Sequence, residues 1–139
     1  MAVRYLIGEK GTGKTKRLID MANNAATTSE GNLVFIDDDS RHMYELHRNV
    51  RFVETSNYHI SSYSEFLGFI CGILSQNNDI LEIFIDGLTN IVGTMDSEAI
   101  LSFSGRLDEL ATENGVKFFI SNNMPADTFP AQLKSQIIQ

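Results

Sequence analysis

A glycine-rich segment near the start of the chain, Gly8-Glu9-Lys10-Gly11-Thr12-Gly13-Lys14-Thr15, directly follows the apolar run at residues 3–7. It matches the pattern G-x-x-x-x-G-K-[ST] at every fixed position, and a helical pattern begins where it ends. Glycines let the backbone curl so tightly that successive N–H groups point at one anion, and the start of the next helix adds further unpaired N–H groups. The segment therefore predicts a strand, a phosphate-binding loop and a helix, in that order.

This loop also carries the side chains that a nucleotide's phosphates need. We expect Lys14 to reach the β- and γ-phosphates and the hydroxyl of Thr15 to ligate Mg²⁺. The variable positions of the motif and the lysine that follows it are weaker candidates, since such side chains are often solvated. The candidate nucleotide-binding residues are Gly8, Glu9, Lys10, Gly11, Thr12, Gly13, Lys14, Thr15 and Lys16.

Along the whole chain, apolar runs bounded by turn residues alternate with helical patterns, which is typical of a mostly parallel sheet covered by helices on both faces. The predicted strands are residues 3–7, 33–36, 58–61, 83–86 and 116–120. The predicted helices are residues 13–26, 40–49, 64–75 and 96–114, with a capping-box pattern at residues 62–65. We therefore predict one three-layer α/β/α domain over residues 1–139, with a five-stranded sheet.

Composition narrows the function classes. The formal net charge is −7, with a sequence pI of about 4.8, and an acidic domain is poorly suited to hold nucleic acid by bulk electrostatics. The single cysteine, Cys71, lies in an apolar helical stretch and is expected to be buried. No apolar run is long enough to span a bilayer, and the first residues lead into a strand instead of a signal peptide. We expect a cytoplasmic protein without a membrane partner.

A second motif supplies an acidic partner for the metal. The apolar run at residues 80–85 ends in Asp86, which is the form of a Walker B element, whose aspartate holds Mg²⁺ while the buried strand fixes its position. Together with the Walker A pattern of residues 8–15, it predicts a complete Mg²⁺–nucleotide site.

Three consecutive acids, Asp37, Asp38 and Asp39, follow the second predicted strand. They are consistent with a solvated helix start capped by Asp39 or Ser40, where the helix dipole favours negative charge. They are equally consistent with one carboxylate that faces the γ-phosphate and polarises the attacking water as a general base. The residues alone leave both interpretations open.

The order of these motifs, with a strand ending in Ser121-Asn122-Asn123 after Asp86, resembles the ATPase core of RecA-like proteins, a branch of the P-loop NTPases. The resemblance implies the sheet order 5-1-4-3-2. It implies that the Walker B aspartate is Asp86 and that the water-activating acid is Asp39, with Asp37 and Asp38 as weaker matches. It also implies a γ-phosphate sensor at Asn122 or Asn123, and ATP as the nucleotide instead of GTP.

Two departures from the family pattern bear on activity. The water-activating position carries Asp where Glu is usual, and Gly87 follows Asp86 where many ATPases place Glu. We therefore expect a weak or partner-dependent Mg-ATPase, or ATP switch; the alternatives are a kinase acting on a nucleoside or other small molecule, and a nucleotide-binding module without turnover. The arginines at positions 41, 48 and 51 fit a solvated helix face or an arginine finger given to a homo-oligomer neighbour or protein partner.

Overall fold

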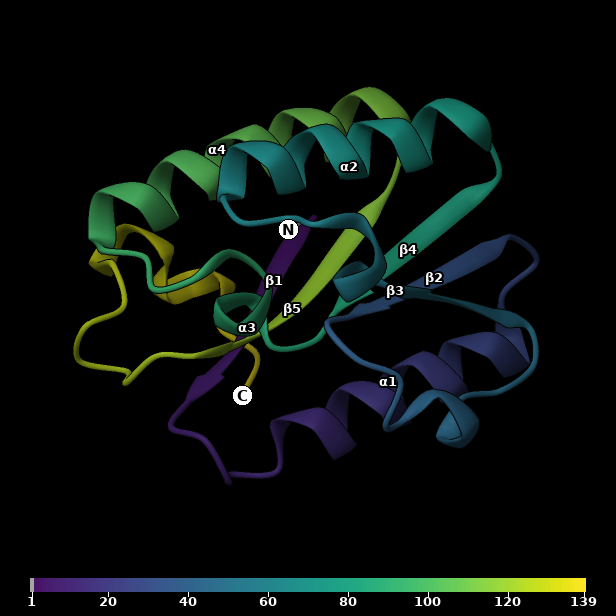
Figure 1. The fold of residues 1–139 in the computed structure, drawn as a ribbon, viewed down its shortest axis with the longest axis horizontal. Helices are drawn as coiled ribbons and strands as arrows, with labels where there is room; N and C mark the ends of the chain where they lie inside the picture. Colours follow the sequence, from purple (N-terminus) through teal and green to yellow (C-terminus); the bar gives the residue numbers. More distant parts are fainter. Residues whose placement is uncertain (1) are drawn as a thin grey trace.

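The computed structural model describes residues 2–139, and its sheet contains five parallel strands in the order β1-β5-β4-β2-β3 (Figure 1). The strands are β1 (Val3–Gly8), β2 (Asn32–Asp37), β3 (Val50–Glu54), β4 (Ile80–Ile85) and β5 (Lys117–Asn123). Because all five run the same way, their carboxyl ends meet at one edge of the sheet. The predicted α/β class is confirmed.

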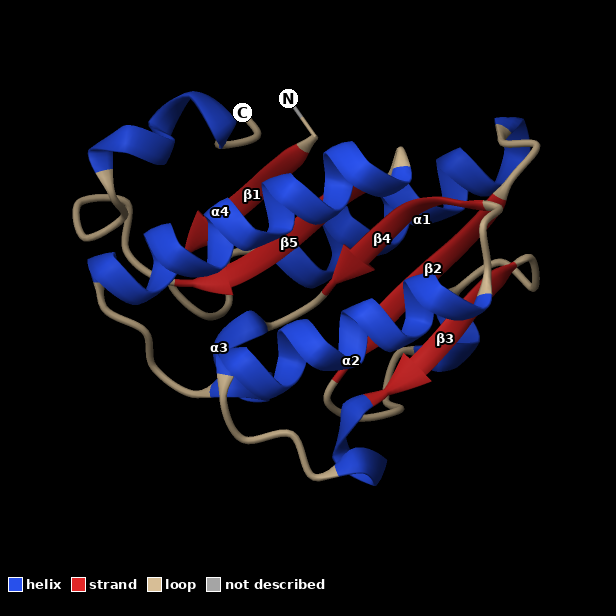
Figure 2. Cartoon of the chain, turned by 90° about the horizontal axis from the view of Figure 1, so that it is seen from above, coloured by secondary structure: helices blue, strands red, loops and turns tan. Residues whose placement is uncertain are grey.

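Helices cover both faces of this sheet. Figures 1 and 2 show α2 (Tyr63–Gln76) and α4 (Ser97–Asn114) on one face and α1 (Lys14–Thr28) on the other. A five-residue helix, α3 (Leu88–Val92), follows β4. Short 3-10 turns complete the fold: η1 (Met43–Glu45), η2 (Thr55–Tyr58) and η3 (Ala131–Gln136). Among residues 2–139, no helix is both long and apolar enough to cross a bilayer.

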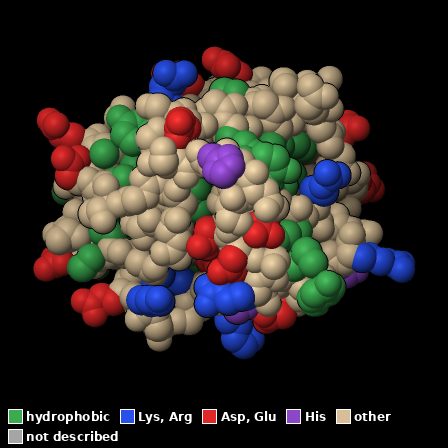
Figure 3. Space-filling view, viewed as in Figure 1, with side chains coloured by type: hydrophobic (Ala, Val, Ile, Leu, Met, Phe, Trp, Pro, Cys, Tyr) green, Lys and Arg blue, Asp and Glu red, His purple; other side chains and the backbone are tan. Residues whose placement is uncertain are grey.

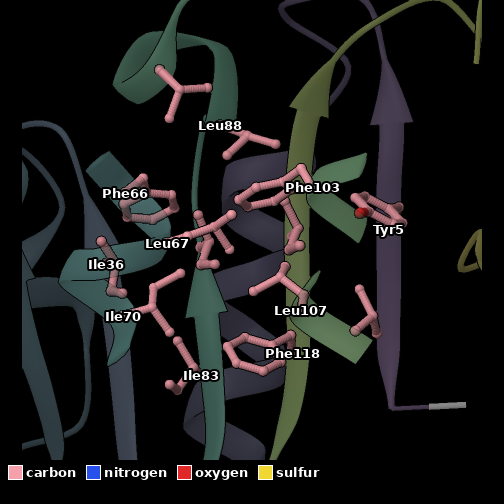
Figure 4. Close-up of a cluster of buried hydrophobic side chains, with 14 of the residues drawn as sticks. Tyr5, Ile36, Phe66, Leu67, Ile70, Ile83, Leu88, Phe103, Leu107 and Phe118 are labelled. Atoms are coloured by element: carbon pink, nitrogen blue, oxygen red, sulfur yellow. The ribbon is translucent and has the colours of Figure 1, made fainter. Parts of the chain in front are cut away.

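Each face of the sheet has its own apolar core. The larger core lies under α2 and α4, where the rings of Phe66 and Phe103 stack with centroids 6.2 Å apart (Figure 4). The smaller one lies under α1 and includes Leu18, Phe35 and Phe84. Burial on both faces explains why the strands are continuously apolar and do not alternate.

The predicted strand order 5-1-4-3-2 is wrong. β1 lies at the end of the sheet, with β5 between it and β4, whereas the resemblance implied a strand on each side of β1. Beyond β1 the C-terminal segment makes a single parallel bridge, in which the Ile138 N–H donates to the Tyr5 carbonyl at 2.7 Å. The third strand is also earlier than predicted, at Val50–Glu54, because residues 55–58 form a 3-10 turn.

The predicted helix at residues 40–49 is absent apart from the η1 turn. This stretch is instead held against α1 by Asn23, whose amide donates to the Glu45 carbonyl at 2.9 Å and accepts from the His47 N–H at 2.7 Å. The other predicted helices form close to their expected bounds. Ser62 caps α2 as predicted, accepting from the Glu65 N–H at 3.1 Å. The thiol-bearing Cys71 is exposed, which contradicts its predicted burial.

Candidate functional site

The loops at the carboxyl ends of four strands enclose a cavity of about 240 Å³. This edge is where open α/β sheets usually bind ligands. Its lining comes from β1's loop, from α1 and from the ends of β5, β4 and β2. The residues are Lys10, Gly11, Gly13, Lys14, Thr15, Asp37, Asp38, Arg41, Asp86, Gly87, Asn90, Ser121 and Asn123.

The glycine-rich loop gives the cavity its N–H donors. Gly11 and Gly13 adopt φ of 88° and 83°, in the left-handed region that side-chain-bearing residues rarely enter. Gly13 directly precedes α1, whose N-terminus has no side-chain cap and no acidic residue in its first turn. The start of α1 therefore presents N–H groups and a positive dipole end that no acidic side chain of its first turn neutralises.

Lys14 is folded back into this loop. Its ammonium donates to the carbonyls of Gly8 and Glu9 at 2.9 and 2.7 Å and to the Thr12 hydroxyl at 3.1 Å. The residue is only 9% exposed. Burial lowers the pKa of Lys14, and the nearby Asp86 carboxylate partly offsets this shift. The loop thus holds a cation where the motif predicts that phosphates bind.

Asp86 lies at the centre of the site, directly after β4. The Thr15 hydroxyl donates to both of its carboxylate oxygens, at 3.2 and 3.1 Å, and the Ser121 hydroxyl donates to Oδ1 at 2.7 Å. Ser121 in turn accepts from the Gly87 N–H at 2.7 Å. The structure therefore brings together Thr15 and Asp86, the two residues predicted to hold Mg²⁺. Their hydroxyl and carboxylate oxygens are the hard ligands that Mg²⁺ prefers.

Asp37, the last residue of β2, is the second carboxylate of the cavity. It is only 3% exposed. Its Oδ1 accepts from the Asp38 N–H at 2.7 Å, while Oδ2 is buried without a hydrogen-bond partner among the described residues. Burial and the neighbouring carboxyl groups of Asp38 and Asp86 raise the pKa of Asp37 to about 8. This carboxyl group is therefore largely protonated at neutral pH.

Asp39 has a carboxylate oxygen within 4.8 Å of one from Asp37 and one from Asp38, but the residue lies outside the cavity lining. Its carboxylate accepts from the Arg41 N–H at 3.0 Å and pairs with the Arg41 guanidinium, with Nε 2.9 Å from Oδ2. The hydrogen bond from the Arg41 backbone, aided by the guanidinium, lowers the pKa of Asp39. Of the acidic cluster, the structure thus gathers Asp37 and Asp38 at the site with Asp86.

Of the other predicted residues, Lys10, Lys16 and Asn122 differ in whether they reach the cavity. Lys10 lines the cavity, whereas Lys16 is exposed and pairs with Asp20 at 3.2 Å. Asn122 is fully buried outside the lining, and neither of its amide atoms has a hydrogen-bond partner within residues 2–139. Its neighbours Ser121 and Asn123 line the cavity instead. Sequence reasoning missed Ser121, although a serine near the end of a buried strand is an unusual polar residue there.

The backbone explains why glycine follows Asp86. Gly87 adopts φ of 67°, and a Cβ atom at this position would lie 2.8 Å from the Asn90 amide nitrogen. A glutamate here would meet both the strained backbone and this contact. The turn from β4 into α3 therefore requires the residue that departs from the pattern of many ATPases.

The surface around the site is mixed in charge. Figure 3 shows acidic side chains gathered at the middle of the face seen in Figure 1, with lysine or arginine side chains next to them. Acids at positions 37, 38 and 86 share the cavity with cations at positions 10, 14 and 41. The cavity therefore carries charges of both signs, although the net charge of the chain is negative.

Comparison with known proteins adds no assignment. No protein-family model matches the sequence, and a search of curated proteins found no match.

Proposed function

We propose that this chain binds a nucleoside triphosphate together with Mg²⁺, at the cavity between the glycine-rich loop and Asp86. One observation carries the proposal: Lys14 and Thr15, from the loop–helix junction, line one cavity with Asp86, which follows β4, and the Thr15 hydroxyl contacts the Asp86 carboxylate at 3.1 and 3.2 Å. The N–H groups of the loop and of α1 would bind phosphate oxygens, and the Lys14 ammonium would exchange its loop carbonyls for them. ATP is favoured over GTP by the resemblance to RecA-like cores.

The metal fits the residues present. Thr15 and Asp86 would hold Mg²⁺, which in such sites neutralises phosphate charge. Ser121 keeps the Asp86 carboxylate oriented, since it donates to one oxygen and is itself fixed by the Gly87 N–H. Its role is that of a positioning residue behind the metal ligand.

As to activity, we propose slow or partner-dependent ATP hydrolysis. Asp37, not Asp39, is the carboxyl group placed to act on a water molecule in the cavity, because Asp39 is engaged by Arg41. In the metal-free chain a carboxyl group with a pKa of about 8 is mostly protonated at neutral pH, and the protonated form cannot take a proton from water. Gly87 offers no carboxylate to replace it. These features support weak turnover.

A kinase activity is the second candidate, and a neighbouring cavity favours it. This cavity, of about 460 Å³, shares Asn123 with the candidate site and is otherwise lined by hydroxyl, carboxylate, methionine and proline side chains, several of them near α3 and the start of α4. It offers room for a small hydroxyl-bearing acceptor. ADP release that rises when an acceptor is added, above the rate with water alone, would favour a kinase over an ATPase.

Binding is tested by thermal unfolding with and without Mg-ATP. At a nucleotide concentration one hundred times Kd, binding stabilises the folded state by about 2.7 kcal/mol. We expect this stabilisation in the wild type and in Lys16→Ala, whose side chain lies outside the cavity, and its loss in Lys14→Ala and Asp86→Asn. A wild type that neither melts higher nor gives binding heat with Mg-ATP would refute the proposal.

A further inference from the structure

Arg41 is a cation of the candidate site, although the sequence alone did not predict it there. From the sequence it was expected on a solvated helix face or as an arginine finger given to a neighbour, but that helix is absent and Arg41 lies on the loop that follows β2. From there it lines the same cavity as Lys14 and Asp86, and it is the single arginine in that lining.

The cavity extends across the carboxyl ends of the strands. The glycine-rich loop follows β1 at one end, Asp86 follows β4 in the middle, and Asp37, Asp38 and Arg41 belong to β2 and the loop after it at the other end. A polyphosphate held by the loop would point its far end toward these acids. Carboxylates repel phosphate, so a cation is required at the β2 end, and Arg41 is the one in the lining there.

Arg41 is also free to make this contact. Its side chain is 70% exposed, and its Nε bonds to Asp39. Among residues 2–139, its two terminal nitrogens have no hydrogen-bond partner, which leaves four N–H donors of the guanidinium for a ligand. An exposed ion pair of this kind contributes little to stability, so the guanidinium can turn toward a phosphate while the Asp39 carboxylate keeps it nearby.

We propose that Arg41 binds the terminal phosphate of the nucleotide within its own chain, held ready by Asp39, and thereby makes the site prefer triphosphates to diphosphates. This inference rests on the proposed nucleotide binding. It gives Asp39 the role of a positioning residue, and it assigns the arginine to the same subunit instead of a neighbour. A planar guanidinium presents two N–H donors to two phosphate oxygens in a fixed fork, a geometry that the point-charge ammonium of a lysine lacks.

The test compares the dissociation constants of Mg-ATP and Mg-ADP, measured by titration calorimetry on the full chain. Arg41→Ala is expected to weaken ATP binding by about tenfold to a hundredfold and ADP binding by less than about twofold. Arg41→Lys should lose much of the preference for Mg-ATP over Mg-ADP, because an ammonium lacks the forked N–H donors of a guanidinium. The matched control is Arg48→Ala, an exposed arginine of the same loop outside the cavity lining, which should change neither constant.

The outcomes separate the two proposals. A wild type that binds neither nucleotide overturns the proposed function and this inference with it. A wild type that binds ATP, while Arg41→Ala weakens ATP and ADP equally or no more than Arg48→Ala does, overturns this inference alone. Mixing Arg41→Ala with Lys14→Ala tests the subunit assignment: unchanged weak ATP binding supports it, and recovery to the wild-type affinity overturns it.

Discussion

Ser121→Ala is the most informative single change outside the loop, because this hydroxyl makes two buried contacts at the centre of the site. It donates to Asp86 Oδ1 and accepts from the Gly87 N–H, both at 2.7 Å. The substitution removes one oxygen and leaves little cavity, so the loss is confined to these two bonds. The Gly87 N–H stays buried without a partner, and the Asp86 carboxylate keeps the Thr15 hydroxyl.

The expected change in the free energy of unfolding follows from the loss of these two hydrogen bonds. A hydrogen bond to an ionised group contributes about 1.5–3 kcal/mol, and a buried donor left unpaired costs about 1–3 kcal/mol. Because Asp86 retains Thr15, the lower parts of both ranges apply, and we expect a loss of about 3 kcal/mol. For 139 residues at roughly 2.1 cal/mol/K each, the unfolding entropy is about 0.3 kcal/mol/K, so the melting temperature should fall by about 10 °C.

The assay is urea unfolding, with Ser104→Ala as the control. Ser104 is also buried and accepts from the Tyr5 hydroxyl at 2.9 Å, but it lies on α4, away from the site. We expect Ser104→Ala to lose about 1–2 kcal/mol and to keep the full stabilisation by Mg-ATP. Ser121→Ala should show a larger loss in the free energy of unfolding and should also lose part of the stabilisation by Mg-ATP. A Ser121→Ala variant within about 0.5 kcal/mol of the wild type, the range of an ordinary surface substitution, would refute the reasoning.

Three further changes test the fold and the acidic pair. Burial raises the folded-state pKa of Asp37 from 3.8 to about 8, so the folded chain binds more protons than the unfolded chain between these values and loses stability as the pH rises through them. Asp37→Asn should therefore match the wild type near pH 4 and exceed its urea midpoint at pH 9; equal midpoints at both pH values would contradict the assignment. Gly87→Ala should cost about 1–3 kcal/mol in the same assay, because φ is 67° and Asn90 is close, whereas Gly105→Ala, within α4 and with no atom within 4 Å of the added Cβ, should be neutral or stabilising. Phe103→Ala should cost about 3–5 kcal/mol, since its fully buried ring packs on Tyr63 and Phe66; a loss below 1 kcal/mol (roughly one methylene) would show that α4 does not pack there.

Local sequence patterns correctly predicted the elements whose formation depends on neighbouring residues. The run at residues 3–7, the glycines and the helical spacing after them predicted β1, the loop and α1, and Ser62 marked the start of α2. Strand β3 was missed because it is a half-buried edge strand whose short apolar run is interrupted by Arg51 and ends at Glu54. The order of the strands depends on pairing between residues far apart in the chain, which no local pattern contains.

The same distinction applies to the site. Lys14, Thr15 and Asp86 are fixed by motifs, and the structure places them together. The choice among three consecutive acids was not fixed, because it depends on where β2 ends. Asp37 is its last residue and lies buried beside Asp86, while Asp39, two residues later, turns back onto Arg41. The prediction of Asp39 rested on family position alone, and the structure places this residue outside the cavity lining, where Asp37 and Asp38 are found.

The pair of carboxyl groups on Asp37 and Asp86 lowers the stability of the chain when no ligand is bound. Asp37 and Asp86 end adjacent strands, β2 and β4, so the sheet itself brings the two carboxyl groups together. Neither Lys14 nor Arg41 forms a direct ion pair with these two carboxyl groups, because Lys14 donates to loop carbonyls and Arg41 pairs with Asp39. Asp37 therefore carries an unpartnered buried oxygen and a raised pKa, which is a net loss for the isolated chain. A bound metal ion would supply the missing positive charge, and a polyphosphate would take up the N–H donors of Lys14 and the terminal nitrogens of Arg41. On this account the residues that destabilise the isolated chain are those that make ligand binding favourable.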